Sequence, residues 1–564
     1  MAPPRPEDAD LVDEALLGSC MGVARGARAE WVETLAERYE GVRRAVGEGG
    51  GGRKTGAWFT GACEVAMLLD RAMPAAPGAR WRACDPACGT GHVLAAAGER
   101  LRARGWTGAG IARALRGMDV DPVAVAIARV RMAMRFGGAL AAWRRAIRVG
   151  DALAAGAWAD GRFDAVVGNP PFLGQLSARS ARSDDERRAR RARFGGAVTR
   201  YVDESAAFLM LGTELAPAGR VVLVQPCSVL AASDAQGVRE ACAATHALAE
   251  VAMLPARAFG AAVRTCIVSL CAGRAARTVA RDEAGRAHAV PAGRLSGGRW
   301  GAALASVRGV PAVTIVGRGA DTLGSLAAFE ADFRQHYYGL KGRVREARGA
   351  TPGRGERALV TSGAIGPASL AWGARRTRIH GADRQRPVVR AADLAGDAVM
   401  EAWHAARSGP KVLVAMQTGV PEAWVDAAGR TLPSVPVVSA RPRRPADLWK
   451  VAAAILSPAI AAEAWWRHGG SGMSPGALRL SARDLAAMPV PADGRAWARG
   501  ARALRAWQRQ PASAAARRAF AEAMCDAYRV PPGSPRGVLI DWWNAAVTRA
   551  ARTVHGAGAA RSIC

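Results

Sequence analysis

Short apolar stretches alternate with alanine-rich stretches of helical pattern between residues 53 and 275. Parallel strands need a long crossover, usually a helix, so this alternation predicts a mainly parallel sheet with helices on both faces. The expected strands are 80–84, 115–119, 146–149, 163–168, 220–225, 249–253 and 265–270. A short loop joins the last two, which predicts an antiparallel hairpin at the edge of the sheet. The predicted fold class is therefore α/β.

The first predicted strand runs into a glycine-bearing turn, Asp85-Pro86-Ala87-Cys88-Gly89-Thr90-Gly91, and a helical stretch follows it. Glycines let the backbone approach a ligand closely, and a helix N-terminus offers unpaired N–H groups to an anion. The carboxylate of Asp85 disfavours a phosphate-rich dinucleotide at this turn and favours an ammonium group. S-adenosylmethionine fits, because its methionine end carries an ammonium and a carboxylate but no phosphate.

Two further acidic residues stand where the second and third predicted strands end. Asp119 and Val120 close the second strand, and Asp151 and Ala152 follow the third. The first carboxylate can accept both hydroxyls of a ribose, and the second can accept from an adenine amino group. Ligands of open α/β sheets bind at the carboxyl ends of the strands, so these residues are expected at one site.

The tetrapeptide Asn169-Pro170-Pro171-Phe172 follows the fourth predicted strand. Its two prolines restrict φ at successive positions and remove two backbone donors, and Pro170 biases Asn169 to an extended backbone. The result is a stiff loop that presents carbonyl acceptors, one amide side chain and one aromatic face. Such a loop is suited to accept hydrogen bonds from a planar amino group and to stack on its ring. We interpret it as the site of chemistry on an exocyclic amine.

Together these motifs resemble the gamma-class DNA adenine-N6 methyltransferases of restriction–modification systems, which join a catalytic domain to a target-recognition domain. The stretch 56–60 is similar to the family's opening cofactor motif, with Gly61 in place of the usual proline. The turn at 85–91 and the tetrapeptide match two further motifs, with Phe172 in place of the commoner tyrosine. Later motifs of the family are resembled by 203–208, 224–228 and 258–265.

The resemblance implies a Rossmann-like catalytic domain that uses S-adenosylmethionine as its cofactor. It implies catalytic roles for Asn169, Pro170, Pro171 and Phe172, with Phe172 and Phe259 stacking on the target base. The residues that it implies for cofactor binding are Thr60, Asp85, Ala87, Cys88, Gly89, Gly91, Asp119, Val120, Asp151, Ala152 and Asn169.

The mechanism implied for such a site is mostly positioning. The N6 of adenine is a poor nucleophile because its lone pair is delocalised into the ring. Acceptors from the Asn169 side chain and the Pro170 carbonyl would bond its hydrogens and free the lone pair for attack on a sulfonium methyl. The base must leave the duplex to reach the pocket, which costs a few kcal/mol that stacking partly recovers.

The formal charge of +30, from 78 basic and 48 acidic residues, predicts a polyanionic partner such as a nucleic acid, and the resemblance implies that this partner is double-stranded DNA. Codon bias explains arginine over lysine but not this excess. Residues 179–200 are read either as a loop that grips phosphates or as a solvated helix. Two basic runs are candidates for DNA contact, with solvated loops as the equal alternative. Their residues are Arg375, Arg376, Arg378, Arg441, Arg443 and Arg444.

Five regions are expected along the chain. They are a helical segment with a glycine-rich linker (1–52), the catalytic domain (53–275), a linker (276–325), a mixed α/β target-recognition domain (326–492) and a helical extension (493–564). Strands at 388–390, 411–416 and 437–439 are expected in the fourth. Neither extension suggests a nuclease domain, so any cognate nuclease is expected to be encoded separately.

No signal peptide, uninterrupted apolar run of about 18 residues or paired CxxC set is evident in the sequence. A cytoplasmic, monomeric protein with reduced cysteines and no metal site is expected, and the apolar stretch 451–466 is expected to be a core helix.

Two alternatives to DNA adenine methylation stay open. The first is a methyltransferase of the same core that acts on another amine, which could be cytosine N4, RNA adenine or a protein glutamine. The charge of +30 and the second domain argue against the glutamine enzymes. The second alternative is a non-catalytic scaffold that binds DNA.

Overall fold

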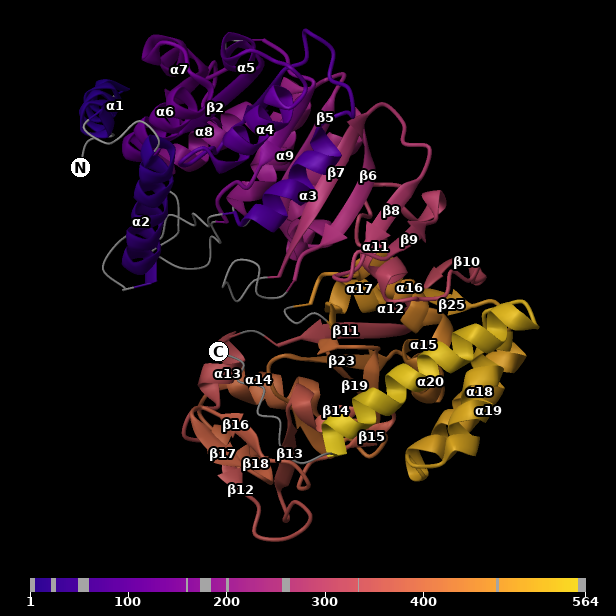
Figure 1. Cartoon of the computed structure of the whole chain (residues 1–564). Helices are drawn as coiled ribbons and strands as arrows, with labels where there is room; N and C mark the ends of the chain where they lie inside the picture. The colour runs from indigo at the N-terminus through magenta and orange to yellow at the C-terminus, as the bar shows by residue number, and fades with distance from the viewer. Residues whose placement is uncertain are drawn as a thin grey trace. The chain divides into compact units, whose positions relative to one another are not determined.

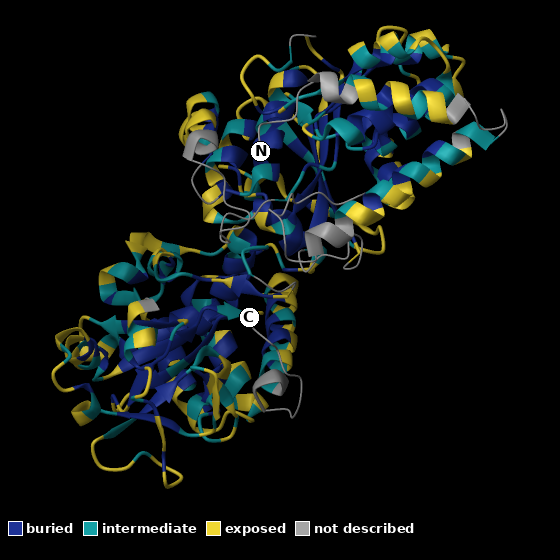
Figure 2. Cartoon of the chain, turned by 90° about the vertical axis from the view of Figure 1, so that its left-hand side faces the viewer, coloured by how far each residue is buried: buried dark blue, intermediate teal, exposed yellow. Residues whose placement is uncertain are grey.

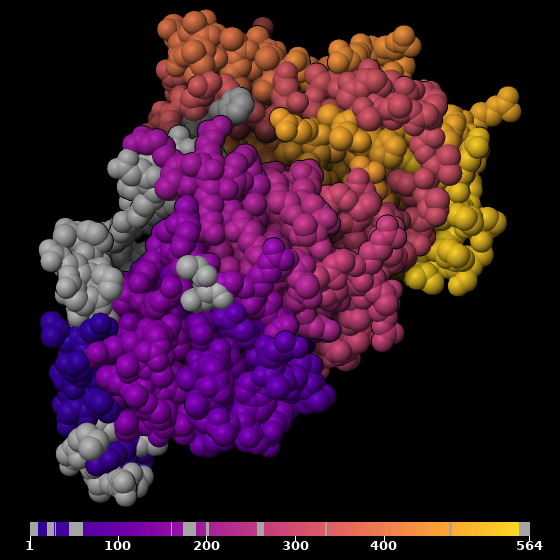
Figure 3. Space-filling view, turned by 90° about the horizontal axis from the view of Figure 1, so that it is seen from above, coloured from indigo at the N-terminus to yellow at the C-terminus, as the bar shows by residue number. Residues whose placement is uncertain are grey.

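The structure of the protein is a computed structural model, shown in Figure 1. It describes residues 6–21, 27–48, 60–158, 161–172, 184–198, 202–255, 264–332, 334–472 and 476–555. The chain forms two compact units, Met1–Val307 and Arg308–Cys564, and each is described here by itself. Figure 3 shows one face of the molecule, coloured from indigo at the N-terminus to yellow at the C-terminus.

The first unit is built on a sheet of nine strands in the order β3-β2-β1-β4-β5-β7-β6-β8-β9, counted over the described residues. Strands β1 to β5 run parallel, and β7 pairs antiparallel with both β5 and β6. The α/β class, the mainly parallel sheet and the antiparallel hairpin are confirmed. The bounds are β1 (Ala83–Asp85), β2 (Leu115–Asp119), β3 (Ile147–Val149), β4 (Ala165–Gly168), β5 (Arg220–Pro226), β6 (His246–Met253), β7 (Thr265–Ala272), β8 (Thr278–Arg281) and β9 (Ala287–Val290).

The predicted hairpin is not at the edge of the sheet. β8 pairs parallel with β6, β9 pairs antiparallel with β8, and α11 (Ala302–Val307) follows them. The expectation of a linker over 276–325 is therefore wrong for 278–290 and for the helix. Each added strand has four residues, and the alternation of β8 was therefore too short to detect from the pattern.

Helices cover both faces of this sheet. Val222 and Val224 of β5 belong to one hydrophobic cluster with residues of α3, α4 and α6. A Cβ at Gly212 of α9 would lie 2.5 Å from Val221 Cγ1, so α9 packs on the opposite face, to which alternate strand residues point. The bounds are α3 (Ala62–Ala72), α4 (His92–Arg102), α5 (Gly108–Ala114), α6 (Pro122–Phe136), α7 (Leu140–Ala146), α9 (Glu204–Leu215) and α10 (Gln236–Ala243). Figure 2 shows the buried residues in dark blue.

The helical pattern predicted for the N-terminal segment is present as two helices, α1 (Pro6–Met21) and α2 (Arg28–Glu48). Both pack against α6. Arg129 of α6 is buried and its Nη1 pairs with Asp10 at 2.6 Å and with Asp13 at 3.0 Å. Because a buried charge is costly without a partner, these pairs tie α1 to α6 of the first unit.

The described part of the arginine-rich segment 179–200 contains a helix, α8 (Asp184–Phe194), followed by a short 3₁₀ turn. Two of its arginines bond the loop that follows β3. Arg190 is buried and Arg193 Nη1 donates to the carbonyls of Ala152 and Ala154. This segment was predicted to be either a loop that grips phosphates or a solvated helix, and residues 184–194 are helical. The side chain of Arg190, however, is buried and not solvated.

The second unit is mixed α/β and contains, among its described residues, two sheets of four strands in the orders β11-β23-β19-β21 and β12-β18-β13-β22. The strands predicted at 388–390, 411–416 and 437–439 are β18, β19 and β23. The bounds are β10 (Gly317–Thr322), β11 (Ala327–Ala331), β12 (Arg345–Glu346), β13 (Glu356–Val360), β14 (Ile365–Gly366), β15 (Ser369–Leu370), β16 (Thr377–Ile379), β17 (Ala382–Arg384), β18 (Pro387–Arg390), β19 (Lys411–Ala415), β20 (Gln417–Thr418), β21 (Glu422–Asp426), β22 (Thr431–Pro433), β23 (Val437–Pro442), β24 (Leu478–Arg479) and β25 (Pro489–Pro491).

The helices of this unit are α12 (Leu323–Leu326), α13 (Arg334–Gly339), α14 (Ala398–Arg407), α15 (Leu448–Leu456), α16 (Pro458–His468), α17 (Ala482–Ala486), α18 (Gly494–Arg509), α19 (Ala514–Ala527) and α20 (Ser534–His555). The last three form the predicted helical extension. Trp507 of α18, Phe520 of α19 and Trp543 of α20 meet with ring centroids 5.5–6.0 Å apart. This aromatic cluster holds the three helices together.

The apolar stretch 451–466 is buried as predicted but forms parts of two helices. Pro458 has no N–H, so α15 ends before it, and Ser457 Oγ accepts from the N–H of Ile460 at 3.2 Å to begin α16. Among the described residues, no single helix is long and apolar enough to cross a membrane. The segments Pro445–Leu456 and Pro458–His468 are together long and apolar enough to do so, but the angle between them is 56°.

Candidate active site

The residues predicted for the site stand at the carboxyl ends of adjacent strands. Asp85 ends β1, Asp119 ends β2, and Asn169 follows β4, while the strand order β3-β2-β1-β4 makes these strands neighbours. Asp151 follows β3 at the end of the same row. Parallel pairing places all four tips on one edge of the sheet, as the sequence predicted.

The turn between β1 and α4 is closed by hydrogen bonds to the strand tips. Asp85 Oδ1 accepts from the N–H of Ala87 at 3.1 Å, and Asp119 Oδ2 accepts from the N–H of Gly89 at 2.8 Å. Gly89 and Gly91 have φ of +51° and +84°, a conformation that favours glycine. A Cβ at Gly91 would also lie 3.0 Å from that of Ala128. The backbone can therefore approach a ligand at this turn.

Asp85 is buried at the centre of the site. Burial raises the pKa of this carboxyl from 3.8 to about 7, the charge of Asp119 adds to the rise, and the Ala87 N–H opposes it. A Cβ at Gly168 would lie 2.5 Å from Asp85 Oδ1, so Asp85 packs against the end of β4. The carboxyl thus lies between the glycine turn and the end of β4, and an ionised carboxylate at this position would attract a cationic group.

Asp119 holds the turns after β1 and β2 together. Its Oδ1 accepts from the N–H of Asp121 at 3.0 Å, in addition to the bond from Gly89 to Oδ2. Burial raises its pKa, and these two N–H donors oppose the rise. Each oxygen keeps lone pairs that suit ribose hydroxyls. Val120 is 61% exposed, an unusual state for a large apolar side chain and one that suits contact with a flat ring.

Asp151 is engaged by a residue that sequence reasoning did not single out. Its Oδ1 accepts from the N–H of Leu153 at 2.9 Å, and its Oδ2 accepts from Arg190 Nη2 at 2.6 Å. Arg190 also lies 3.5 Å from Glu204 Oε1. The sequence offered no signal for this residue, because it is one of several arginines in α8 and its partners lie 39 and 14 positions away.

The Asn169–Phe172 loop contacts Thr60, the last residue of the stretch 56–60. Asn169 Nδ2 donates to Thr60 Oγ1 at 3.1 Å, which brings together two residues that lie 109 positions apart and that the sequence placed at one site. Pro170 is buried, and Pro171 is half-buried. Phe172 is half-buried and packs against the hydrophobic cluster of the sheet, so part of its ring serves the core. Phe259 and residues 56–59 lie outside the described residues.

The six candidate DNA contacts lie in the second unit and differ in exposure. Arg376, Arg378, Arg443 and Arg444 are exposed. Arg375 is half-buried and donates to the carbonyl of Gly363 at 3.1 Å. Arg441 is half-buried too, and its Nη2 lies 3.4 Å from Glu330 Oε1. The exposed four are therefore the members best placed to meet a phosphate.

Comparisons with known proteins find a match to a family model and matches among solved structures. Residues 32–284 match the model of a family described as N-6 DNA methylase. No curated protein matches the chain by sequence.

Among solved structures, the type IIL restriction-modification enzyme MmeI, in complex with DNA, shares the fold. Its TM-score is 0.53 at 12% identity, and the match covers 84% of this chain and 73% of that one. A type I methyltransferase subunit from Streptococcus thermophilus also matches, at 18% identity with a TM-score of 0.32, over 41% of this chain. The chain spans 49% of that subunit.

Proposed function

Because residues 32–284 of this chain belong to the N-6 DNA methylase family, we propose that the protein methylates N6 of adenine in double-stranded DNA. The methyl donor is S-adenosylmethionine, the target adenine lies in one short sequence and is flipped from the duplex, and the protein is the modification component of a restriction–modification or related defence system. One observation carries the proposal: Asp85, Asp119 and Asn169 stand at the carboxyl ends of adjacent strands, with Asn169 bonded to Thr60.

The donor set at the strand tips fits the proposed cofactor. The glycine turn and the N-terminus of α4 would hold the carboxylate of its methionine part, and Asp85 would hold the ammonium. Asp119 would accept the ribose hydroxyls and Asp151 the adenine amino group. When bound, the cofactor supplies a methyl group on a sulfonium, which is already activated for transfer.

The loop Asn169–Phe172, which is the catalytic loop of this proposal, would hold the target amine. The bond from Asn169 Nδ2 to Thr60 orients the side-chain amide, whose oxygen is the acceptor for one hydrogen of the adenine N6. The carbonyl of Pro170 would accept the second hydrogen. Phe172 would stack on the base with the part of its ring that the core leaves accessible. These contacts pull the nitrogen towards a pyramidal geometry, so its lone pair becomes available.

The second unit would read the target. We propose that its sheet region, 326–492, is a target-recognition domain and that Arg376, Arg378, Arg443 and Arg444 meet DNA phosphates or bases. Their exposure and the charge of +30 support this role. MmeI, which shares the fold, is described in complex with DNA.

The proposal is tested by expressing the full chain in a host without adenine methylation and sequencing the DNA by a long-read method that detects modified bases. N6-methyladenine in one short motif is expected, and it should disappear with Asn169→Ala. Modified cytosine instead of adenine would point to N4 methylation, and unmodified DNA with methylated RNA or protein would move the activity to another amine. Either result would contradict the proposal.

A further inference from the structure

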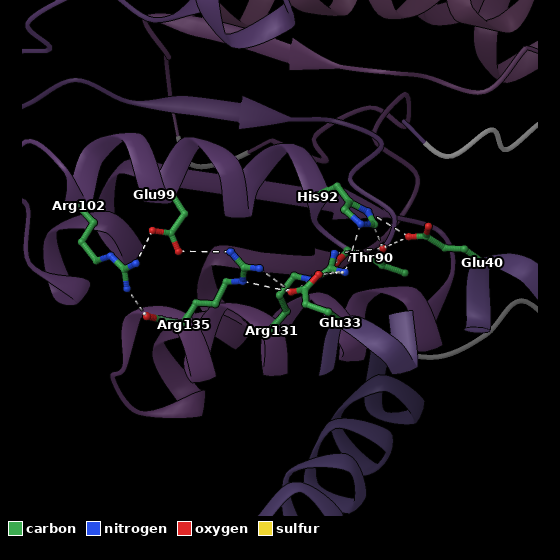
Figure 4. A network of polar contacts seen from close by, with 8 residues as sticks. All are labelled: Glu33, Glu40, Thr90, His92, Glu99, Arg102, Arg131 and Arg135. Carbon is green, nitrogen blue, oxygen red and sulfur yellow. Dashed lines mark hydrogen bonds and ion pairs between the residues drawn. The ribbon is translucent and has the colours of Figure 1, made fainter. Parts of the chain in front are cut away.

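Helix α2 lies directly against the glycine turn at the site, although it precedes the strand–helix core (Figure 4). Glu40 of α2 is 6% exposed and accepts a hydrogen bond from the hydroxyl of Thr90, which is 1% exposed. Glu40 Oε1 also lies 3.1 Å from His92 Nδ1. Thr90 stands between Gly89 and Gly91, so α2 reaches the middle of the turn.

The carbonyl of the same threonine is held as well. Arg131 Nη1 of α6 donates to Thr90 O at 2.5 Å. That guanidinium is oriented by Glu33 of α2, whose carboxylate accepts from Arg131 Nε at 3.1 Å and Nη2 at 3.0 Å (Figure 4). The hydroxyl and the carbonyl of Thr90 therefore depend on α2, the first directly and the second through Arg131.

A third contact reaches the tip of β2. The hydroxyl of Tyr39 donates to Asp121 Oδ2 at 2.6 Å, and Arg43 Nη2 lies 3.4 Å from the same oxygen. Asp121 in turn donates its N–H to Asp119 Oδ1. Burial and the Asp121 carboxylate raise the pKa of Tyr39 well above its ordinary value, so the hydroxyl stays protonated and can donate.

This polar arrangement is an unusual way to dock a helix. Burying the Glu40 carboxylate costs free energy that an apolar contact would avoid, and its partners are the glycine turn and the residue next to it. From this arrangement we infer that α2 is part of the cofactor site. Glu40 is a positioning residue that acts through Thr90 on the Gly89–Gly91 turn, and Tyr39 acts through Asp121 on Asp119. The inference rests on the proposed use of S-adenosylmethionine.

The test measures the S-adenosylmethionine Kd of the purified full chain by calorimetry. Glu40→Ala and Thr90→Val are each expected to weaken binding about 10-fold, the effect of losing one charge-assisted hydrogen bond. The loss of affinity in the double variant should be smaller than the sum of the two single losses, because the hydrogen bond between Thr90 and Glu40 is common to both changes. Glu40→Gln should recover most of the affinity, since its amide oxygen still accepts from Thr90.

The matched control is Glu37→Ala, which removes an exposed carboxylate from the same helix and should leave the Kd unchanged. Tyr39→Phe removes one oxygen atom, so it keeps the test informative if Glu40→Ala fails to fold, and it should also weaken binding several-fold. In methylation assays, the KM for the cofactor should rise while kcat at saturating cofactor stays within about twofold, because the chemistry is untouched.

The outcomes separate the two proposals. If the unaltered protein does not bind S-adenosylmethionine, the proposed function fails. If the unaltered protein binds S-adenosylmethionine, and the variants Tyr39→Phe and folded Glu40→Ala bind it with the same Kd, the inference is overturned. Additive losses in the double variant would also overturn it, since Glu40 would then not act through Thr90. A lowered kcat together with a lowered melting temperature and an unchanged KM would mark α2 as a merely structural support.

Discussion

Arg190 Nη2 of α8 donates to Oδ2 of Asp151, at the tip of β3, over 2.6 Å. The arginine side chain is 9% exposed and the carboxylate 43%, so a largely buried cation holds an accessible acceptor. Helix α8 comes after the Asn169–Phe172 loop in the chain. The pair therefore links the segment beyond the catalytic loop to the place where the cofactor's adenine is proposed to bind.

Arg190→Met should weaken S-adenosylmethionine binding several-fold, because Asp151 loses the partner that orients it while the apolar stem of the side chain is kept. The Kd measures this effect directly. Arg191→Met is the matched control, since Arg191 is exposed on the same helix. Tighter binding by Arg190→Met would show instead that Arg190 competes with the cofactor for Asp151.

Asp85 makes the stability of the cofactor-free protein depend on pH. The pKa of this carboxyl is about 7 in the folded protein, against an ordinary value of 3.8. The folded state therefore holds the proton more tightly than the unfolded chain. The contribution of this group to stability is therefore present at low pH and is lost as pH rises towards 7.

Asp85→Asn removes this dependence. At pH 8 the variant should be more stable than the unaltered protein. Because one pKa unit corresponds to about 1.4 kcal/mol, the gain in the free energy of unfolding should be a few kcal/mol at most. Near pH 4 the difference should vanish. Denaturant unfolding at both pH values measures it, and S-adenosylmethionine binding should be lost because no carboxylate meets the ammonium. An equal gain at both pH values would show that Asp85 is not the titrating group.

Gly168→Ala tests the contact between β4 and Asp85. The new Cβ would lie 2.5 Å from Asp85 Oδ1, so either the carboxyl or the start of the catalytic loop must move. We expect a loss of stability of about 1–3 kcal/mol, as for other overpacked sites, and a loss of methyl transfer of at least about 100-fold. Gly78→Ala, whose Cβ would meet no heavy atom within 4 Å, is the control. Normal activity of Gly168→Ala would refute the close packing.

Thr60→Val tests how Asn169 is oriented. The substitution keeps the volume of the side chain and removes the acceptor of Asn169 Nδ2, so the amide can rotate. A fall in kcat of about 10-fold is expected for Thr60→Val. A fall of about 1,000-fold is expected for Asn169→Ala, which removes the amide oxygen that accepts from the adenine N6. Duplex binding should be unchanged in both. A larger effect of Thr60→Val on the cofactor Kd than on kcat would place Thr60 on the cofactor instead.

The paired variant Arg376→Ala/Arg378→Ala tests the second unit as a DNA-binding surface. Each phosphate contact contributes about 0.9 to the slope of log K against log salt, so two lost contacts should lower the slope by about 1.8. Binding to a duplex, titrated at several salt concentrations, gives the slope. Arg502→Ala, on the exposed side of α18, serves as the control. An unchanged slope would show that neither Arg376 nor Arg378 contacts a DNA phosphate.

The sequence by itself determined strands β1 to β7 of the main sheet and the row of side chains along its edge. Strands such as β2 and β5 were predicted to within a residue because apolar runs and the glycine and acidic residues that end them are local signals. Parallel pairing then places successive strand tips on one edge, so Asp85, Asp119, Asp151 and Asn169 could be assigned to one site without coordinates.

Only the tertiary structure decided what surrounds that row. The partners of Thr90 in α2, of Asp121 at Tyr39 and of Asp151 at Arg190 lie 39–82 positions away along the chain. In the sequence, these partners look like any other arginine, glutamate or tyrosine on a helix. Periodicity predicts which face of a helix is buried, but not which residue of another element that face contacts. The strands β8 and β9 were missed for a related reason, since a four-residue strand is stabilised by its neighbours in the sheet more than by its own pattern. The local sequence motifs thus predicted the proposed reaction, whereas only the tertiary structure showed which residues of α2 and α8 hold the site residues in place.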